Sequence, residues 1–170
     1  MNEANLLSYN NHRPLYETES DRASEREAIA QVEFQFDSEI GQTKPKALVD
    51  AVMKKGGIEW AYVELKCRDN RYQAQVEVEG YMISMIKWDR LKNVTKTDKP
   101  ILLVVTFGPS KRPDEAYGLW IDHKAQYPTR MAGRLIEREN RTRNDYEKMR
   151  DKEVCYFIPW KEFTPLWNMD

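Results

Sequence analysis

Three side chains within residues 47–68 have the types and spacing that metal-assisted phosphodiester hydrolysis requires. Asp50 lies in one short apolar run, and the triplet Glu64-Leu65-Lys66 lies in the next one. Two carboxylates can hold a divalent cation, and a lysine beside them can act on the attacking water. The segment therefore predicts a hydrolytic metal site built by two neighbouring strands.

The alternation of side chains along a strand separates these residues by face. In a strand over 58–67, Glu64 and Lys66 share one face, whereas Leu65 lies on the other face, which is small and apolar. Asp50 is the only polar residue of the preceding strand, so across a hairpin we expect it to lie beside Glu64. The alternative is an exposed ion pair of Glu64 with Lys66 and an incidental Asp50.

A third carboxylate is predicted on the first helix, over 20–36. At about 100° per residue, Glu25 falls on the same stripe as Ile29 and Val32, and an unpaired charge on a packed stripe is costly. Glu27 points to the opposite side, so we interpret it as solvated. We expect Glu25 to join the two strand acids. The alternative is that it only favours the dipole at the helix start.

The rest of the chain predicts an α/β or α+β fold with a mixed central sheet of about five strands flanked by helices. Residues 1–18 are expected to form a flexible N-terminal arm, and residues 19–170 a single domain. The expected elements are helices over 20–36 and 79–94, strands over 47–53, 58–67, 101–107, 116–121 and 154–158, a loop over 38–45, and a charged insertion over 124–152 that is helical from 129 to 149.

Composition narrows the classes of function. Cys67 and Cys155 lie far apart without a partner histidine, which excludes a zinc ribbon and a disulfide framework. The longest apolar run, 101–105, is far too short to span a bilayer, so we expect no membrane association and a cytoplasmic protein. The net charge of -1 decides nothing about a nucleic-acid partner, because only nearby charge acts on a bound polyanion.

The order of these motifs resembles the PD-(D/E)XK nuclease superfamily: a helix that bears an acid, then Asp50, a hairpin, and Glu64-x-Lys66. More narrowly, it resembles small phage-borne members over roughly residues 20–122. The matching segments are Asp21-Arg22-Ala23-Ser24-Glu25, VELKCR, YMISMIKW and ILLVVTF. Val49 stands where the family name has proline. The resemblance implies a restriction-endonuclease-like core.

The resemblance also implies a role for each residue of the site. Asp50, Glu64 and the carbonyl of Leu65 would bind Mg²⁺ or Mn²⁺, and Glu25 would hold a second metal or orient its water. Lys66 would position or deprotonate the attacking water and stabilise charge on the phosphate. Oxygen ligands favour these metals over zinc. DNA is the implied substrate, the host cytoplasm is the implied location for a phage protein, and a homodimer is compatible with the fold.

Six further side chains are candidates for contacts with nucleic acid: Arg68, Arg71, Ser84, Lys87, Arg134 and Arg138. The first two follow the triplet, the next two lie on the predicted second helix, and the last two belong to arginines spaced by three or four residues. The alternative for Lys87 and for the two arginines of the series is a solvated face. The competing hypothesis for the whole chain is a catalytically silent protein of the same fold that binds nucleic acid or a host factor.

Overall fold

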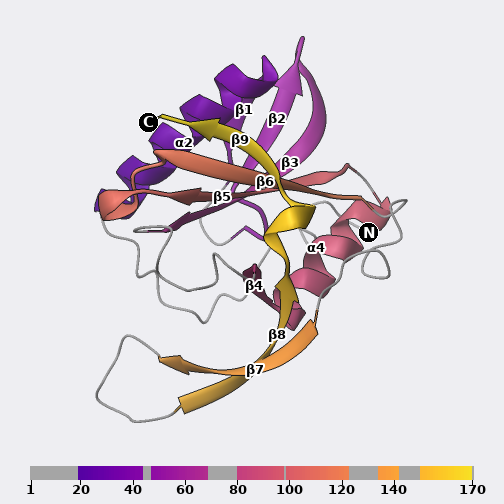
Figure 1. The fold of residues 1–170 in the computed structure, drawn as a ribbon. Coiled ribbons are helices and arrows are strands. Elements are labelled where there is room, and N and C mark those ends of the chain that lie inside the picture. The colour runs from indigo at the N-terminus through magenta and orange to yellow at the C-terminus, as the bar shows by residue number, and fades with distance from the viewer. Residues whose placement is uncertain are drawn as a thin grey trace.

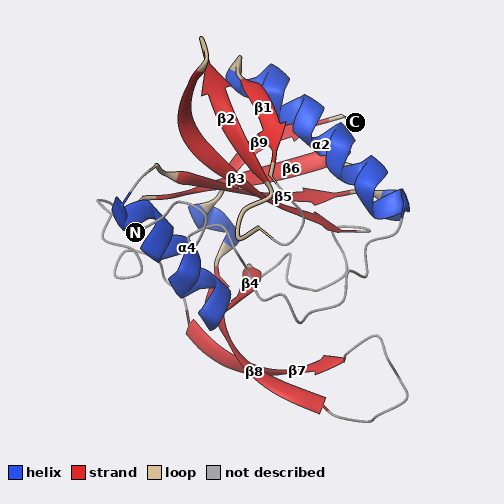
Figure 2. Cartoon of the chain, turned by 180° about the vertical axis from the view of Figure 1, so that it is seen from behind, coloured by secondary structure: helices blue, strands red, loops and turns tan. Residues whose placement is uncertain are grey.

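The computed structural model describes residues 19–43, 47–68, 80–97, 99–122, 134–141 and 150–169, of which 97, 134–141 and 150–153 are described as backbone only. Figures 1 and 2 show the arrangement of their helices and strands. In chain order these are α2 (Glu19–Phe36), β1 (Glu39–Gln42), β2 (Ala51–Lys55), β3 (Ile58–Arg68), β4 (Tyr81–Ser84), α4 (Met85–Thr97), β5 (Ile101–Phe107), η2 (Pro109–Lys111), β6 (Glu115–Ile121), β7 (Arg134–Arg141), β8 (Arg150–Ile158), η4 (Trp160–Glu162) and β9 (Thr164–Asn168).

A six-stranded mixed sheet forms the centre of the fold, in the order β1-β2-β3-β5-β6-β9. β3 and β5 run parallel, and the other neighbouring strands run antiparallel. The predicted mixed sheet with flanking helices is therefore confirmed. A second sheet, β4-β8-β7, was not predicted as separate, and Figure 1 shows β7 and β8 reaching away from the central sheet.

The helices α2 and α4 cover opposite faces of the central sheet. Val32 of α2 packs in one apolar cluster with Val63 and Leu65 of β3. Trp88 of α4 packs in the other cluster with Tyr62, the residue that precedes Val63 on β3. The strand β5 serves both clusters, and all seven of its residues are buried. This explains why Thr106 is its only polar residue, since both faces of the strand are covered.

The hairpin predicted after Asp50 is present, but its first strand is shorter than expected. Gly56 and Gly57 form the turn with φ of 59° and 78°, a conformation that glycine adopts easily. β2 begins at Ala51, and residues 48–50 form a bend. The Asp50 side chain explains the difference, because its Oδ2 accepts the N–H of Leu65 at 2.6 Å. If β2 were longer, one of its main-chain carbonyls would accept the Leu65 N–H instead.

The segment predicted as a helix over 79–94 is a strand followed by a helix. β4 pairs with β8, and Tyr81 lies opposite Ile158. Gly80, with φ of 149°, approaches the Ile158 backbone so closely that a Cβ would lie 2.0 Å from the carbonyl oxygen. Pairing with a distant strand therefore overrides the local helical spacing. The apolar stripe still identified buried residues, since Tyr81 and Trp88 are both in the core.

The helix predicted over 129–149, within the insertion 124–152, is wrong where the structure describes it. Residues 134–141 form β7, which pairs antiparallel with β8 from Arg134 opposite Phe157 to Arg141 opposite Arg150. The spacing of the arginines is compatible with a helix, but the pairing partner is a separate segment that local spacing does not reveal. The predicted arm, 1–18, lies outside the described residues.

The C-terminal tail closes the core with its aromatic residues. β9 pairs with β6 at the edge of the central sheet, and Trp167 packs against the cluster under α2. Phe163 is buried in the opposite cluster, where Trp160 packs against it. In the part of the chain that the structure describes, no helix is long and apolar enough to cross a membrane.

Candidate active site

Asp50, Glu64 and Lys66 meet beside β3. The Lys66 ammonium forms an ion pair with Glu64 Oε1 and lies 3.9 Å from Asp50 Oδ2. It also donates a hydrogen bond of 2.8 Å to the carbonyl oxygen of Leu65. The site is thus built by the middle of β3 and by the bend that precedes β2, and Asp50 reaches β3 through its side chain rather than as a paired strand residue.

A second lysine approaches the same group from α4. Lys87 Nζ lies 3.0 Å from Glu64 Oε2, whereas Lys66 forms its ion pair with Oε1. It also donates a hydrogen bond to the carbonyl oxygen of Leu48, two residues before Asp50. Lys87 therefore connects three elements: α4, β3 and the bend before β2. We expected it to contact phosphate, but its described contacts are with the protein.

Burial and charge act against each other in this group. The Glu64 side chain is fully buried, and this burial raises its pKa despite the nearby Lys66. Burial lowers the pKa of Lys87. Burial also lowers the pKa of Lys66, but the charge of Glu64 and then of Asp50 outweighs it and leaves the pKa raised. Lys66 is therefore protonated at neutral pH, whereas a general base needs a pKa near the working pH.

The oxygens of this group fit a divalent cation. Neither oxygen of the buried Glu64 carboxylate accepts a hydrogen bond of good geometry, although both face ammonium groups. Asp50 Oδ2 and the Leu65 carbonyl contact the same Lys66 ammonium as Glu64 Oε1, so three residues from two elements point oxygens at one centre. Such oxygen donors suit Mg²⁺ or Mn²⁺. Among the described residues, however, no three His, Cys, Asp or Glu side chains are close enough to hold one metal.

Glu25, the third predicted acid, does not form with Asp50 and Glu64 a cluster close enough to hold one metal. It is half-buried on α2, and its charge acts on Cys67 near the end of β3. Cys67 and Leu65 lie on the face of β3 that packs against α2, whereas Glu64 and Lys66 lie on the alternate positions. A role for Glu25 in holding a second metal stays a prediction.

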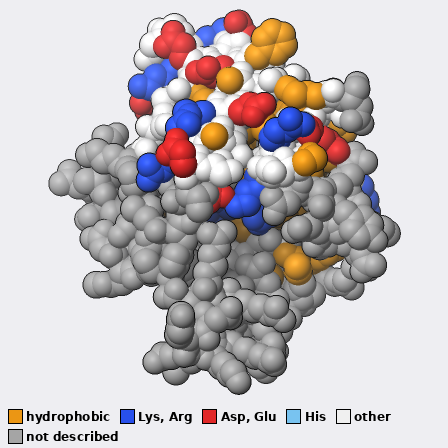
Figure 3. Space-filling view, turned by 90° about the vertical axis from the view of Figure 1, so that its left-hand side faces the viewer, with side chains coloured by type: hydrophobic (Ala, Val, Ile, Leu, Met, Phe, Trp, Pro, Cys, Tyr) orange, Lys and Arg blue, Asp and Glu red, His pale blue; other side chains and the backbone are white. Residues whose placement is uncertain are grey.

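The residues predicted to contact nucleic acid are scattered. Arg68 is exposed at the end of β3, and Ser84 is half-buried at the end of β4. Arg134 and Arg138 belong to the backbone of β7, and Arg71 lies outside the described residues. The face seen in Figure 3 mixes acidic and basic side chains over its described part instead of carrying one large field of a single sign. These contacts also stay predictions.

Thr43, at the end of β1, was not recognised from the sequence. Its hydroxyl donates to the carbonyl oxygens of Val49 and, at 3.0 Å, of Asp50. Its N–H also donates to the Asp50 carbonyl at 3.0 Å. The sequence indicates this contact only through the general tendency of threonine hydroxyls to bond to nearby backbone in turns. That tendency does not identify Val49 and Asp50 as the partners.

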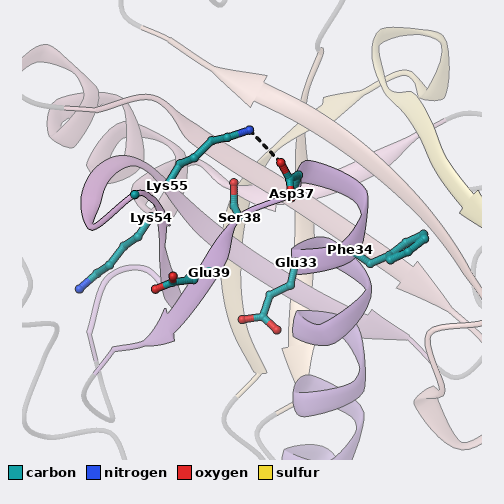
Figure 4. A pocket seen from close by; sticks show the side chains of 8 residues that line it. Glu33, Phe34, Asp37, Ser38, Glu39, Lys54 and Lys55 are labelled. Atoms are coloured by element: carbon teal, nitrogen blue, oxygen red, sulfur yellow. Dashed lines mark hydrogen bonds and ion pairs between the residues drawn. The ribbon is translucent and has the colours of Figure 1, made fainter.

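An open pocket of about 610 Å³ lies away from this group, between the end of α2 and the strands β1 and β2 (Figure 4). It is lined in part by Phe34, which is 86% exposed, and by the exposed ion pair of Lys55 with Asp37. Lys55 ends β2, whereas Asp50 precedes its start. The pocket and the acidic group therefore lie at opposite ends of one strand.

Comparison with known proteins agrees with the geometry. A sequence model of the family described as "phage putative PDDEXK endonuclease" matches residues 11–166, which is most of the chain. No curated protein and no solved structure matches the chain. The mixed sheet with its flanking helices is consistent with the restriction-endonuclease-like fold of the PD-(D/E)XK superfamily. The chain therefore belongs to the phage PDDEXK endonuclease family, a family of nucleases.

Proposed function

We propose that this protein is a divalent-metal-dependent deoxyribonuclease that hydrolyses phosphodiester bonds in DNA. The observation that carries the proposal is the convergence of two carboxylates, one main-chain carbonyl and one ammonium at a single centre. Membership of a nuclease family supports the same reaction class. Mg²⁺ or Mn²⁺ would be held by Asp50, Glu64 and the Leu65 carbonyl, and when bound it would activate water and polarise the phosphate.

The protein's own groups would divide the remaining work. The Leu65 N–H holds the Asp50 carboxylate against β3, the strand that carries Glu64. The two acids would therefore set the position at which the scissile phosphate binds. Lys66, held protonated, would orient the attacking water and stabilise charge that develops on the phosphate oxygens. Arg68, which is exposed two residues after Lys66 on β3, would contact a neighbouring phosphate of the DNA.

Cleavage assays with Mg²⁺ or Mn²⁺ on single-stranded, double-stranded and branched DNA test this proposal. We expect at least one substrate to be cut, and we expect Lys66→Ala to abolish the cutting. Lys96→Ala is the matched control, because Lys96 is exposed on α4 and bonds to Asn93 instead of the acidic group. The proposal fails if no substrate is cut, or if Lys66→Ala cuts as fast as the unmodified protein.

A further inference from the structure

The bend at residues 48–50 is the least regular part of the site, and yet it carries one of the two acids. Leu48 and Val49 are buried, so the bend is not a loose surface loop. Towards the sheet it is held by β3, because the Asp50 N–H donates to the Val63 carbonyl at 2.9 Å and the Leu65 N–H donates to the Asp50 carboxylate. Neither of these two bonds involves the carbonyl oxygen of Val49 or of Asp50.

Thr43 holds the bend from the other side. Its hydroxyl donates to two successive carbonyl oxygens, those of Val49 and Asp50, and its N–H donates to the second of them. Successive carbonyls of an extended strand point to opposite sides, so they cannot both reach one hydroxyl. The Thr43 hydroxyl therefore stabilises the bend specifically, against the longer strand that the apolar sequence around Asp50 favours.

We propose that Thr43 is a positioning residue, whose hydroxyl keeps the Val49–Asp50 backbone bent so that the Asp50 carboxylate stays beside Glu64 and the Leu65 carbonyl. This inference rests on the proposed metal-dependent function of the same group. If the hydroxyl is removed, Asp50 can relax towards a regular strand position, in which the Leu65 N–H is taken by a main-chain carbonyl. The carboxylate then no longer converges with Glu64 on one centre.

Thr43→Val tests the proposal, because valine matches threonine in shape and charge but lacks the hydroxyl. We expect the affinity for Mn²⁺, measured by calorimetry on the full chain without DNA, to fall about 10- to 100-fold, the range found when partners that orient metal ligands are removed. Thr43→Ser keeps the hydroxyl and should bind Mn²⁺ nearly as well as the unmodified protein. Thermal unfolding followed by circular dichroism shows whether each variant is folded.

Thr95→Val is the matched control for a purely structural effect. Thr95 is buried, whereas Thr43 is half-buried, and the Thr95 hydroxyl likewise donates to a main-chain carbonyl, that of Lys92 at 2.8 Å within α4. The same substitution there should lower the melting temperature and leave the Mn²⁺ affinity unchanged. If Thr43→Val does not fold, Thr43→Ala removes the hydroxyl with less bulk and takes its place.

The outcomes separate this inference from the proposed function. If the unmodified protein binds Mn²⁺ and Thr43→Val binds it equally well, the inference is overturned and the proposed function stands. If Thr43→Ser loses as much affinity as Thr43→Val, the hydroxyl is not the cause and the inference is also overturned. If the unmodified protein neither binds Mn²⁺ nor cuts DNA, the proposed function fails first and takes the inference with it.

Discussion

Lys66→Met should change metal affinity and cleavage in opposite directions. The Lys66 ammonium contacts Glu64 Oε1, Asp50 Oδ2 and the Leu65 carbonyl, which are the oxygens that we assign to the metal. Two cations cannot share these oxygens at contact distance, so the metal must displace the ammonium. Methionine has a similar length and no charge, so it removes the competitor and removes the group that acts on water.

The structure sets the magnitude of both changes. A hydrogen bond to a charged group is worth about 1.5–3 kcal/mol, and about 1.4 kcal/mol corresponds to a tenfold change in affinity. Without the ammonium to displace, Ca²⁺ should therefore bind about 10- to 100-fold more tightly. Cleavage in Mg²⁺ should fall about 100- to 1,000-fold, the usual cost of removing one group that stabilises charge in the transition state.

Calorimetry with Ca²⁺ measures the affinity without cleavage of a substrate, and a time course on the preferred DNA in Mg²⁺ measures the rate. Lys96→Met, an exposed substitution on α4, should alter neither quantity. Unchanged or weaker Ca²⁺ binding by Lys66→Met would show that the ammonium and the metal do not compete. If Lys66→Met cleaves DNA as fast as the unmodified protein, Lys66 has no role in the reaction.

Three further predictions concern stability. Burial raises the pKa of Glu64 above 4.5, so the folded state binds the Glu64 proton more tightly than the unfolded state does. The free energy of unfolding, measured by urea titration and compared with that of Glu64→Gln, should therefore fall as the pH rises from 4.5 through the folded-state pKa. A difference between the two proteins that does not change with pH would contradict this. Gly80→Ala should lower the melting temperature, because its Cβ would lie 2.0 Å from the Ile158 carbonyl oxygen and φ is 149°; an unchanged melting curve would show that the strand pair adapts. Trp88→Ala should cost about 3–5 kcal/mol in denaturant unfolding, since Trp88 is fully buried, and a loss below about 1 kcal/mol would mean that the core collapses into the space.

The centre of the site could be predicted from the sequence because it depends on local periodicity. Glu64 and Lys66 occupy alternate positions of β3, and Leu65 packs beneath α2, as the two-residue repeat required. The same repeat misled the interpretation of Asp50. Its neighbours are apolar and typical of a strand, and the bend that replaces the strand accepts hydrogen bonds from Thr43 and Lys87, which lie in other parts of the chain.

The second sheet could not be predicted for a related reason. β4 is only four residues long and joins directly to α4, so its residues continue the spacing of the helix. It becomes a strand through pairing with β8, which follows much later in the chain. β7 likewise carries residues with a helical spacing and becomes a strand through the same partner. Neither pairing has a local signature, since a strand needs a partner that propensity does not specify.

The alternation along β3 has a consequence for how this chain can change in length. Val63 and Leu65 pack beneath α2, whereas Glu64 and Lys66 form the ion-paired group. One residue inserted or deleted just before them would exchange the two sets, so that both charges would enter an apolar cluster. We therefore expect homologous chains to vary in length at the turn of Gly56 and Gly57 and not within β3. There, a single inserted or deleted residue would disrupt both the ion-paired group and the core.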